Sequence, residues 1–220
     1  MKEITTIGLD LAKSVFQLHG VDVGGTVVLR RQLRRAQMLA FFSRLPPCLI
    51  GMEACAGAHY WARELSKFGH EVRLIPPSYV KPFVRRGKTD SADAEAICTA
   101  VMQPSMRFVP VKTPGQQAVL MQHRVRDFLV RQQTQLANAI RAHLGEFGIV
   151  VARGVHHIEK LLDEAAGAAL PESVITSLDL LARQFMDTQA RIAEITRQIV
   201  SGVCAPLSSG LHKGAHEPRV

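Results

Sequence analysis

The sequence contains few cysteines and none of the spacings on which cysteine chemistry depends. Its four cysteines are Cys48, Cys55, Cys98 and Cys204, and no two of them form a Cys-x-x-Cys pair. Zinc ribbons and dithiol redox sites use such pairs, so neither class of site is expected. Cys48, Cys98 and Cys204 are interpreted as ordinary small apolar residues of a protein in a reducing compartment.

The sequence also lacks the marks of export or of membrane insertion. Residues 1–6 do not show the basic stretch followed by an apolar core that a secretory signal has. No apolar run is long enough to cross a bilayer. A cytoplasmic location is therefore expected.

Acidic residues are scarce relative to basic ones, mainly in the first half. The 220 residues hold 27 Lys and Arg against 19 Asp and Glu, a formal net charge of +8. Residues 1–112 hold 16 basic and 9 acidic residues, whereas residues 113–220 hold 11 and 10. A basic first half favours a polyanionic partner, and nucleic acid is the commonest polyanion. Many basic proteins do not bind nucleic acid, so this partner has to be inferred from the motifs as well as from the composition.

The first half alternates short apolar runs with helical patterns. Strands are predicted at residues 4–11, 15–21, 26–33, 48–52 and 71–75, and helices at residues 36–45, 57–68 and 91–102. An antiparallel meander followed by alternating helices and strands favours a mixed sheet with flanking helices. That order predicts the ribonuclease H-like α/β fold.

The pattern becomes helical after Pro114. Residues 116–147 read as one long helix, and Pro171 can open another after some shorter helical segments. Its apolar positions follow a heptad-like spacing at Leu181, Phe185, Ile192, Ile195 and Ile199. A helical hairpin or a dimer seam is predicted, with packing on its own domain as the alternative. The expected domains are residues 1–112, a helical region 113–200 and an atypical, disordered tail 201–220.

Four acids stand where a fold of this kind would bring them together. Asp10 ends the first predicted strand and Glu53 follows the fourth, while Asp90 and Asp93 lie three residues apart at the start of a helix. Four converging carboxylates repel one another unless cations hold them. Mg²⁺ prefers such oxygen ligands, and paired metal ions can clamp a phosphodiester. The acids therefore predict a metal-dependent phosphoryl-transfer site.

Each acid also has a plainer interpretation. Asp10 can be a turn residue at the end of its strand. Asp90 can cap the following helix, with Asp93 as a first-turn acid that suits the helix dipole. A carboxylate directly after an apolar strand is costly without a partner, so Glu53 favours function.

Two basic clusters are candidates for contacts with a nucleic-acid backbone, although a solvated charge run would look the same. They comprise Arg30, Arg31, Arg34 and Arg35, and the loop residues Lys81, Arg85, Arg86 and Lys88. Tyr60 and Trp61 are predicted to be core residues rather than base-stacking ones. His59 can approach Glu53 from its helix, but a surface or core position is favoured.

The motifs together resemble the bacterial insertion-sequence transposases of the IS110 family, which includes the pilin-gene-inverting recombinases. The resemblance is carried by residues 7–13 (IGLDLAK), 52–62 (MEACAGAHYWA), 88–97 (KTDSADAEAI) and 136–149 (LANAIRAHLGEFGI). It covers about residues 4–200 in family order and spacing.

This resemblance implies a RuvC-like domain with an Asp-Glu-Asp-Asp site, which falls on Asp10, Glu53, Asp90 and Asp93. It also implies Mg²⁺ as cofactor, DNA as substrate and a structured guide RNA as a further partner. The helical region resembles the coiled-coil segment through which such proteins form dimers or tetramers. One departure is expected to matter: residues 201–220 do not resemble the opening of the family's second domain, which carries a serine nucleophile. A truncated copy is therefore expected.

Three hypotheses follow from the sequence. The first is a transposase that acts by metal-dependent DNA strand transfer and is truncated here. The second is a self-sufficient, structure-selective RuvC-like endonuclease, which needs only the four acids and a basic groove. The third is a non-catalytic remnant that binds nucleic acid or an intact transposase.

Overall fold

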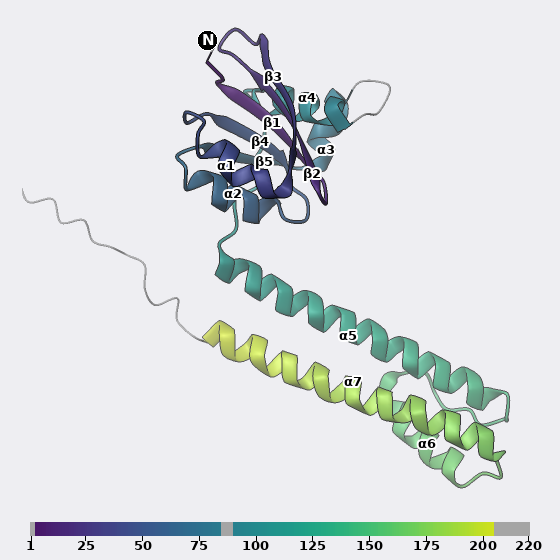
Figure 1. Ribbon diagram of the computed structural model, residues 1–220. Helices are drawn as coiled ribbons and strands as arrows, with labels where there is room; N and C mark the ends of the chain where they lie inside the picture. Colours follow the sequence, from purple (N-terminus) through teal and green to yellow (C-terminus); the bar gives the residue numbers. More distant parts are fainter. Residues whose placement is uncertain (1–2, 85–89, 205–220) are drawn as a thin grey trace, which may run out of the picture. The chain divides into compact units, whose positions relative to one another are not determined.

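The first compact unit, residues 1–114, is a three-layer α/β domain in the computed structural model (Figure 1), which describes residues 3–84 and 90–204. Its strands are β1 (Thr6–Leu11), β2 (Val15–Val21), β3 (Val27–Arg34), β4 (Leu49–Glu53) and β5 (Glu71–Ile75). Its helices are the 3-10 turn η1 (Arg35–Gln37), α1 (Met38–Phe42), α2 (Ala58–Ser66), α3 (Pro77–Val80), the turn η2 (Lys81–Phe83) and α4 (Asp90–Val101).

The five strands form one mixed sheet in the order β3-β2-β1-β4-β5. β1 pairs antiparallel with β2, and β2 pairs antiparallel with β3, which confirms the predicted meander. β4 is parallel to β1, and β5 is parallel to β4. This arrangement is the ribonuclease H-like fold that the order of elements predicts.

Strand alternation divides the side chains of the sheet between two helical layers. On β1, Ile7 and Leu9 are fully buried in a core shared with α1 and α2. The intervening residues Gly8 and Asp10 point to the other face, where α4 packs. Because this side carries Asp10 and Glu53, the α4 face of the sheet is the one that matters for the site.

One predicted helix in this unit is much shorter than expected. Residues 36–45 were predicted to be helical, but α1 covers only Met38–Phe42, and Arg35–Gln37 form a 3-10 turn. The backbone N–H of Arg34 donates to Oε1 of Gln37, which tightens this entry turn. Pro46 and Pro47 stop any extension beyond Leu45, since proline offers no backbone donor.

A buried histidine joins α1 to the sheet. Nδ1 of His70 accepts the N–H of Cys48 (3.2 Å), and Nε2 lies 3.0 Å from the carbonyl oxygen of Phe42. The neutral tautomer with its proton on Nε2 satisfies both contacts. The Cys48 thiol lies 3.6 Å from the same Nδ1, and burial raises its pKa to about 11.

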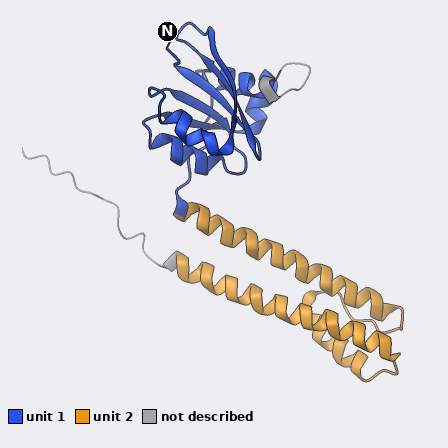
Figure 2. Cartoon of the chain, viewed as in Figure 1, with its two compact units in different colours: residues 1–114 blue, residues 115–220 orange. Residues whose placement is uncertain are grey.

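The second compact unit begins at residue 115 and is helical in its described residues, 115–204 (Figure 2). α5 (Pro114–Gly145) and α7 (Glu172–Cys204) are long, and the turn η3 (Val155–His157) and α6 (Ile158–Ala166) lie between them. The predicted long helix and the helix opened by Pro171 are confirmed. α7 runs to Cys204, so the predicted boundary of the tail at residue 201 falls inside a helix; residues 205–220 lie outside the described residues.

α5 and α7 form an antiparallel hairpin. Nε of Arg126, early in α5, donates to Oγ1 of Thr196, late in α7. At the other end, Ile140 and Leu144 share a buried cluster with Leu178 of α7 and with α6. The predicted hairpin is therefore present, with its apolar core at the end that α6 closes. None of the helices in residues 3–84 and 90–204 is both long and apolar enough to cross a membrane.

Candidate metal-dependent site

Asp10 and Glu53 lie at the ends of two neighbouring parallel strands. The last paired residues of β1 and β4 are Leu9 and Met52, and each acid is the next residue along its strand. Both side chains are partly buried and lie on the α4 face. The parallel register thus brings these two acids together, as strand-end placement predicts.

α4 lies unusually close to the sheet beneath these acids. Gly8 and Gly51 are cross-strand partners. A Cβ at Gly8 would lie 2.1 Å from the carbonyl oxygen of Ala94, and one at Gly51 would lie 2.7 Å from Cβ of Val101. Only glycine at these two positions allows the backbone of α4 to approach this closely. The close approach positions Asp93 of α4 near Glu53 at its strand end.

Asp93 of α4 and Glu53 of β4 line one cleft. Its volume is about 440 Å³, and Pro77, Lys81 and Val84 also line it. Among the described residues, the cleft therefore combines two carboxylates from different elements with the ammonium group of Lys81. Lys81 was selected from the sequence as part of a charge run, whereas the apolar walls Pro77 and Val84 were missed, since no local pattern marks them.

The negative charge at the strand ends affects Cys55, to which the sequence analysis assigned no role. Cys55 is exposed, and its pKa is raised by partial burial and by the charges of Glu53 and Asp10. Both carboxylates therefore act on the same point in space. The position of Cys55, two residues after Glu53, was the available signal for it.

Asp90 is the first residue of α4, three residues before Asp93. Its side chain lies outside the described residues, and so do the predicted phosphate contacts Arg85, Arg86 and Lys88. Within residues 3–84 and 90–204, no three His, Cys, Asp or Glu side chains are grouped closely enough to hold an ion by themselves. The described acids match a hard divalent cation in ligand type, since carboxylate oxygens are what Mg²⁺ prefers.

The arginine cluster on β3 is divided between the two faces of the sheet. Arg30 lies on the α4 face, where its guanidinium is 3.9 Å from a carboxylate oxygen of Glu95. On the opposite face, Arg31 lies over the ring of Phe41 and Arg35 over that of Trp61, each 5.2 Å from the ring centroid. The four residues Arg30, Arg31, Arg34 and Arg35 are all exposed but do not form a single row, because successive strand residues alternate in direction.

Of the two aromatic residues of α2 that were predicted to lie in the core, only one does. Trp61 is 4% exposed and belongs to the core, as predicted, whereas Tyr60 is 44% exposed, contrary to the prediction. Nδ1 of His59 accepts the N–H of Lys112, and Arg63 donates to the carbonyl oxygen of Lys112 (2.6 Å). His59 therefore holds the segment that precedes α5, and the pKa of His59 is lowered by desolvation and by the charges of Lys112 and Arg63.

Comparison with known proteins identifies the family of this chain. Residues 7–149 match the IS110-type DEDD family, described as transposase. The chain belongs to this transposase family. The matched range contains both strand ends, the whole of α4 and the long helix α5. Families of this DEDD type use divalent metal ions in general, which agrees with the carboxylates at the cleft.

Curated relatives carry the same description. A probable family 20 transposase of Pseudomonas aeruginosa is 52% identical over 204 residues, which are 91% of this chain and 60% of the relative. A putative transposase of Sinorhizobium fredii is 48% identical over 91% of this chain and 52% of its own length. The transposase for insertion sequence element IS1328 of Yersinia enterocolitica is 42% identical over 90% of this chain and 60% of its own length. The chain spans between half and two thirds of the length of these relatives.

Proposed function

We propose that residues 1–114 form the metal-dependent phosphoryl-transfer domain of a DNA transposase, with Asp10, Glu53, Asp90 and Asp93 as its carboxylates. Two observations support the proposal: Asp10 and Glu53 end neighbouring parallel strands, and Glu53 and Asp93 line one cleft. Carboxylates placed in this way repel one another, and a bound cation would offset that repulsion. Family membership supports the same assignment.

Mg²⁺ is the cation that this proposal assigns to the four acids. When bound, a divalent cation neutralises charge on a phosphodiester and polarises an attacking oxygen. Glu53 and Asp93 on the wall of the cleft would repel a phosphate if the cation were missing. Lys81, on the same wall, is assigned a contact with a phosphate oxygen, and this ammonium group orients the strand without reading its sequence.

The proposal extends to two partners beyond DNA. Residues 23–52 contain five arginines and no acidic residue, and four of these arginines lie on β3 and the turn η1. We assign a structured RNA as the second polyanion that this positive charge binds. The hairpin of α5 and α7 is assigned the assembly of two or more copies. If RNA binds at β3 and η1, charge reversal of Arg31 and Arg35 weakens RNA binding, whereas neutralising the acids does not.

The experiment that tests the proposal is DNA cleavage and strand transfer by a full-length relative. The variants neutralise the positions that correspond to Asp10, Glu53 and Asp93. We expect a loss of at least about tenfold for each, because removing even a partner that orients a metal ligand typically costs about 10–100-fold in affinity or activity. A matched control neutralises the position of Glu64, which pairs with Lys67 away from the cleft. Activity that survives at the first three positions would exclude these acids from the reaction.

A parallel assay on this chain separates the hypotheses. All described residues of the cleft lie in the first unit, a property that a self-sufficient nuclease would also have. Mg²⁺-dependent nicking of branched DNA by the 220-residue chain would support the endonuclease. Nicking only when an intact relative is added would support a transposase part that needs a second region. Binding without any nicking would leave the non-catalytic remnant.

A further inference from the structure

One segment of the helical unit has a charge opposite to that of the whole chain. Residues 158–182 comprise α6, its connection to α7 and the first part of α7. They hold one basic residue and five acidic ones, a net charge of −4, whereas the chain as a whole carries +8. A surface of this sign repels the phosphates of DNA and RNA, so we exclude nucleic acid as the partner of this segment.

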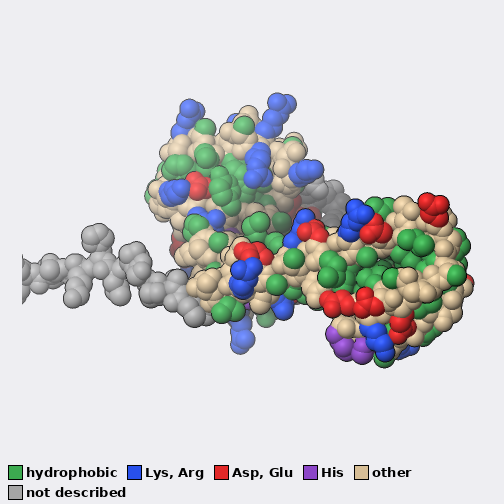
Figure 3. Space-filling view, turned by 90° about the horizontal axis from the view of Figure 1, so that it is seen from below, with side chains coloured by type: hydrophobic (Ala, Val, Ile, Leu, Met, Phe, Trp, Pro, Cys, Tyr) green, Lys and Arg blue, Asp and Glu red, His purple; other side chains and the backbone are tan. Residues whose placement is uncertain are grey.

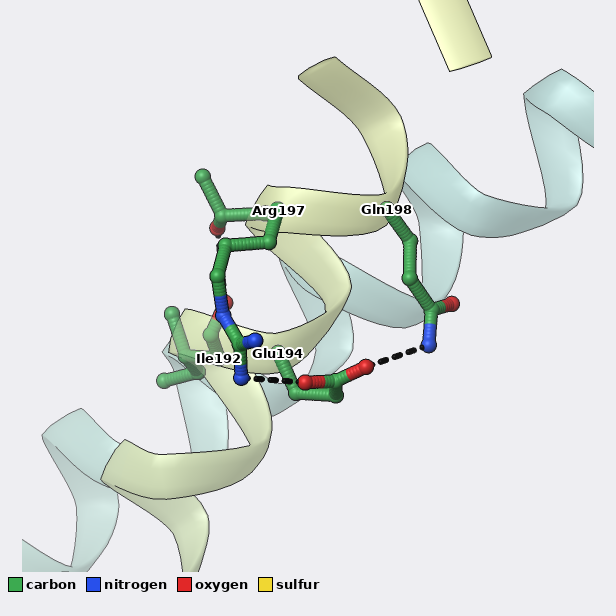
Figure 4. Close-up of polar contacts among 5 residues, drawn as sticks. Ile192, Glu194, Arg197 and Gln198 are labelled. Atoms are coloured by element: carbon green, nitrogen blue, oxygen red, sulfur yellow. Dashed lines mark hydrogen bonds and ion pairs between the residues drawn. The ribbon is translucent and has the colours of Figure 1, made fainter. Parts of the chain in front are cut away.

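Three of the five acids in this segment are not neutralised by a neighbouring basic residue. Further along α7, by contrast, the carboxylate of Glu194 accepts from a guanidinium nitrogen of Arg197 and from Nε2 of Gln198 (Figure 4). In residues 158–182 two acids have a basic partner one helical turn away. The other three are exposed and have no basic partner in the described part of the chain: Glu159, Asp163 and Glu172. This segment therefore presents negative charge that can attract a cationic partner.

An apolar pocket lies in the same segment, between α6 and α7. Its volume is about 330 Å³, and its lining combines leucines, an isoleucine and three alanines with the carboxylate of Asp179. Leu178 is 7% exposed and belongs to the buried cluster of this unit, whereas Ile175 is 51% exposed. The pocket therefore extends from the solvent to the core of the helical unit.

The unpaired acids border this pocket. On α6, Glu159 and Asp163 share a helix face with Ala166 of the pocket, since the three residues follow at spacings of four and three. On α7, Glu172 lies three residues before Ile175 and therefore on the same face. In Figure 3 acidic side chains lie around an apolar area at the end of this unit where α6 is found. An exposed apolar area with a polar border is typical of a surface that binds another protein.

We propose that the pocket between α6 and α7 docks a basic amphipathic helix of a partner protein. An apolar side chain of that helix enters the pocket beside Ile175, and its Lys or Arg residues lie next to Glu159, Asp163 and Glu172, because opposite charges favour this placement. The backbone groups of α6 and α7 are engaged within their own helices, so the partner contacts side chains, and an amphipathic helix laid in a hydrophobic groove suits such a surface. The pocket residues all belong to the second unit, so this inference goes beyond the proposed phosphoryl transfer.

The test is the binding of two designed helical peptides to the 220-residue chain, measured by fluorescence anisotropy at low ionic strength. Both peptides are about 18 residues, or five helical turns, long and carry the same leucines along one face. One has Lys on both sides of the leucines, and the other has Glu at the same positions. We expect saturable binding of the Lys peptide, at least about tenfold tighter than that of the Glu peptide, and a loss of this difference as salt screens the charges.

Two variants of the chain test the pocket itself. Ile175→Gln removes an apolar wall, and Ala182→Leu fills part of the space without removing any contact. Each is expected to weaken binding of the Lys peptide at least about tenfold, because the side chain buried at the centre of a contact carries much of its energy. Met186→Gln is the matched control, since Met186 lies on the same helix outside the pocket and is 48% exposed, close to the 51% of Ile175. Circular dichroism verifies that the variants remain helical.

A third variant tests the acids. Glu159→Gln with Asp163→Asn is expected to weaken binding of the Lys peptide about threefold and to reduce its salt dependence, as charges at the border of a contact do. The control removes two charges that are already paired within α7, by Asp187→Asn with Glu194→Gln, and should leave the affinity unchanged.

Four results would overturn the proposal. The first is the absence of saturable binding of the Lys peptide up to about 1 mM, which is the limit of a specific contact. The second is equal affinity for the Lys and Glu peptides, and the third is unchanged affinity in both pocket variants. The fourth is a dimer of the chain in sedimentation velocity that Ile175→Gln disrupts, since the pocket would then hold a second copy. Metal binding by the first unit is measured separately, so none of these results bears on the proposed function.

Discussion

Glycine at two positions matters as much to this site as the acids themselves. Asp10 and Glu53 follow from the strand register, but the distance of Asp93 from them depends on the close approach of α4 to Gly8 and Gly51. At Gly8 the neighbouring atoms belong to the backbone of α4, which cannot move aside as a side chain can. The residues that bring the acids together are therefore different from the residues that do chemistry.

The substitution Gly8→Ala tests this dependence. The added methyl group would lie 2.1 Å from the carbonyl oxygen of Ala94, so α4 must move away from the sheet. We expect the free energy of unfolding to fall by about 2–3 kcal/mol, the upper part of the range for overpacked cores. Urea denaturation measures the loss. Gly24→Ala is the control, because its Cβ would make only an ordinary contact 3.4 Å from Asp22, and an equal loss in both variants would contradict the account.

Thiol reactivity reports on the same packing. Burial raises the pKa values of Cys48 and Cys98 to about 11, so both thiols are protonated and shielded at pH 8. In a Cys204→Ser background, iodoacetamide is expected to modify the exposed Cys55 in the folded chain, and Cys48 and Cys98 only after unfolding. Mass spectrometry of the modified peptides gives the result. Rapid labelling of Cys98 in the folded chain would mean that α4 does not lie on Gly8.

At the scale of elements, His59 ties α2 to the segment between α4 and α5. Its Nδ1 accepts the N–H of Lys112, and this bond requires an unprotonated nitrogen. Desolvation and the nearby cations Lys112 and Arg63 lower the pKa of His59 in the folded chain. The unfolded chain therefore binds this proton more readily than the folded chain does.

This difference gives a pH dependence with a defined sign. Stability is expected to be independent of His59 protonation well above pH 6.5, the ordinary value for histidine, and to fall as the pH decreases through and below it. The variant His59→Gln should lose less stability between pH 7 and pH 5 than the wild type. Denaturant midpoints at the two pH values measure the difference. If the stability of His59→Gln fell more steeply than that of the wild type, His59 would not be the cause of the pH dependence.

A helix or strand could be predicted where residues close together in the sequence mark its bounds. The strands at residues 15–21 and 71–75 were predicted with the observed bounds, because apolar runs between turn residues mark them clearly. The arginines of β3 were grouped by sequence proximity, and strand alternation then separated Arg30 from Arg31. The contact of Gly8 with Ala94 joins residues 86 positions apart, so no local pattern reveals it. The four acids were predicted as one set from the order of the elements and from the resemblance of the motifs to the transposase family, and their shared role stays a prediction.

At the scale of the whole molecule, the chain divides into a domain with the acidic cleft and a helical hairpin. The first unit holds every described residue of the cleft, so its metal binding can be measured in this chain without a DNA substrate.

The most direct test of the central claim is Mn²⁺ binding to the 220-residue chain by isothermal titration calorimetry, with Mn²⁺ as the probe for the Mg²⁺ site. The account predicts saturable binding that is weakened at least about tenfold by Asp10→Asn, Glu53→Gln or Asp93→Asn, as removal of a charged ligand should do. Glu64→Gln, which lies outside the cleft, should leave the affinity unchanged. Equal affinity in the wild type and the three cleft variants would contradict the claim that these acids form one metal-dependent site.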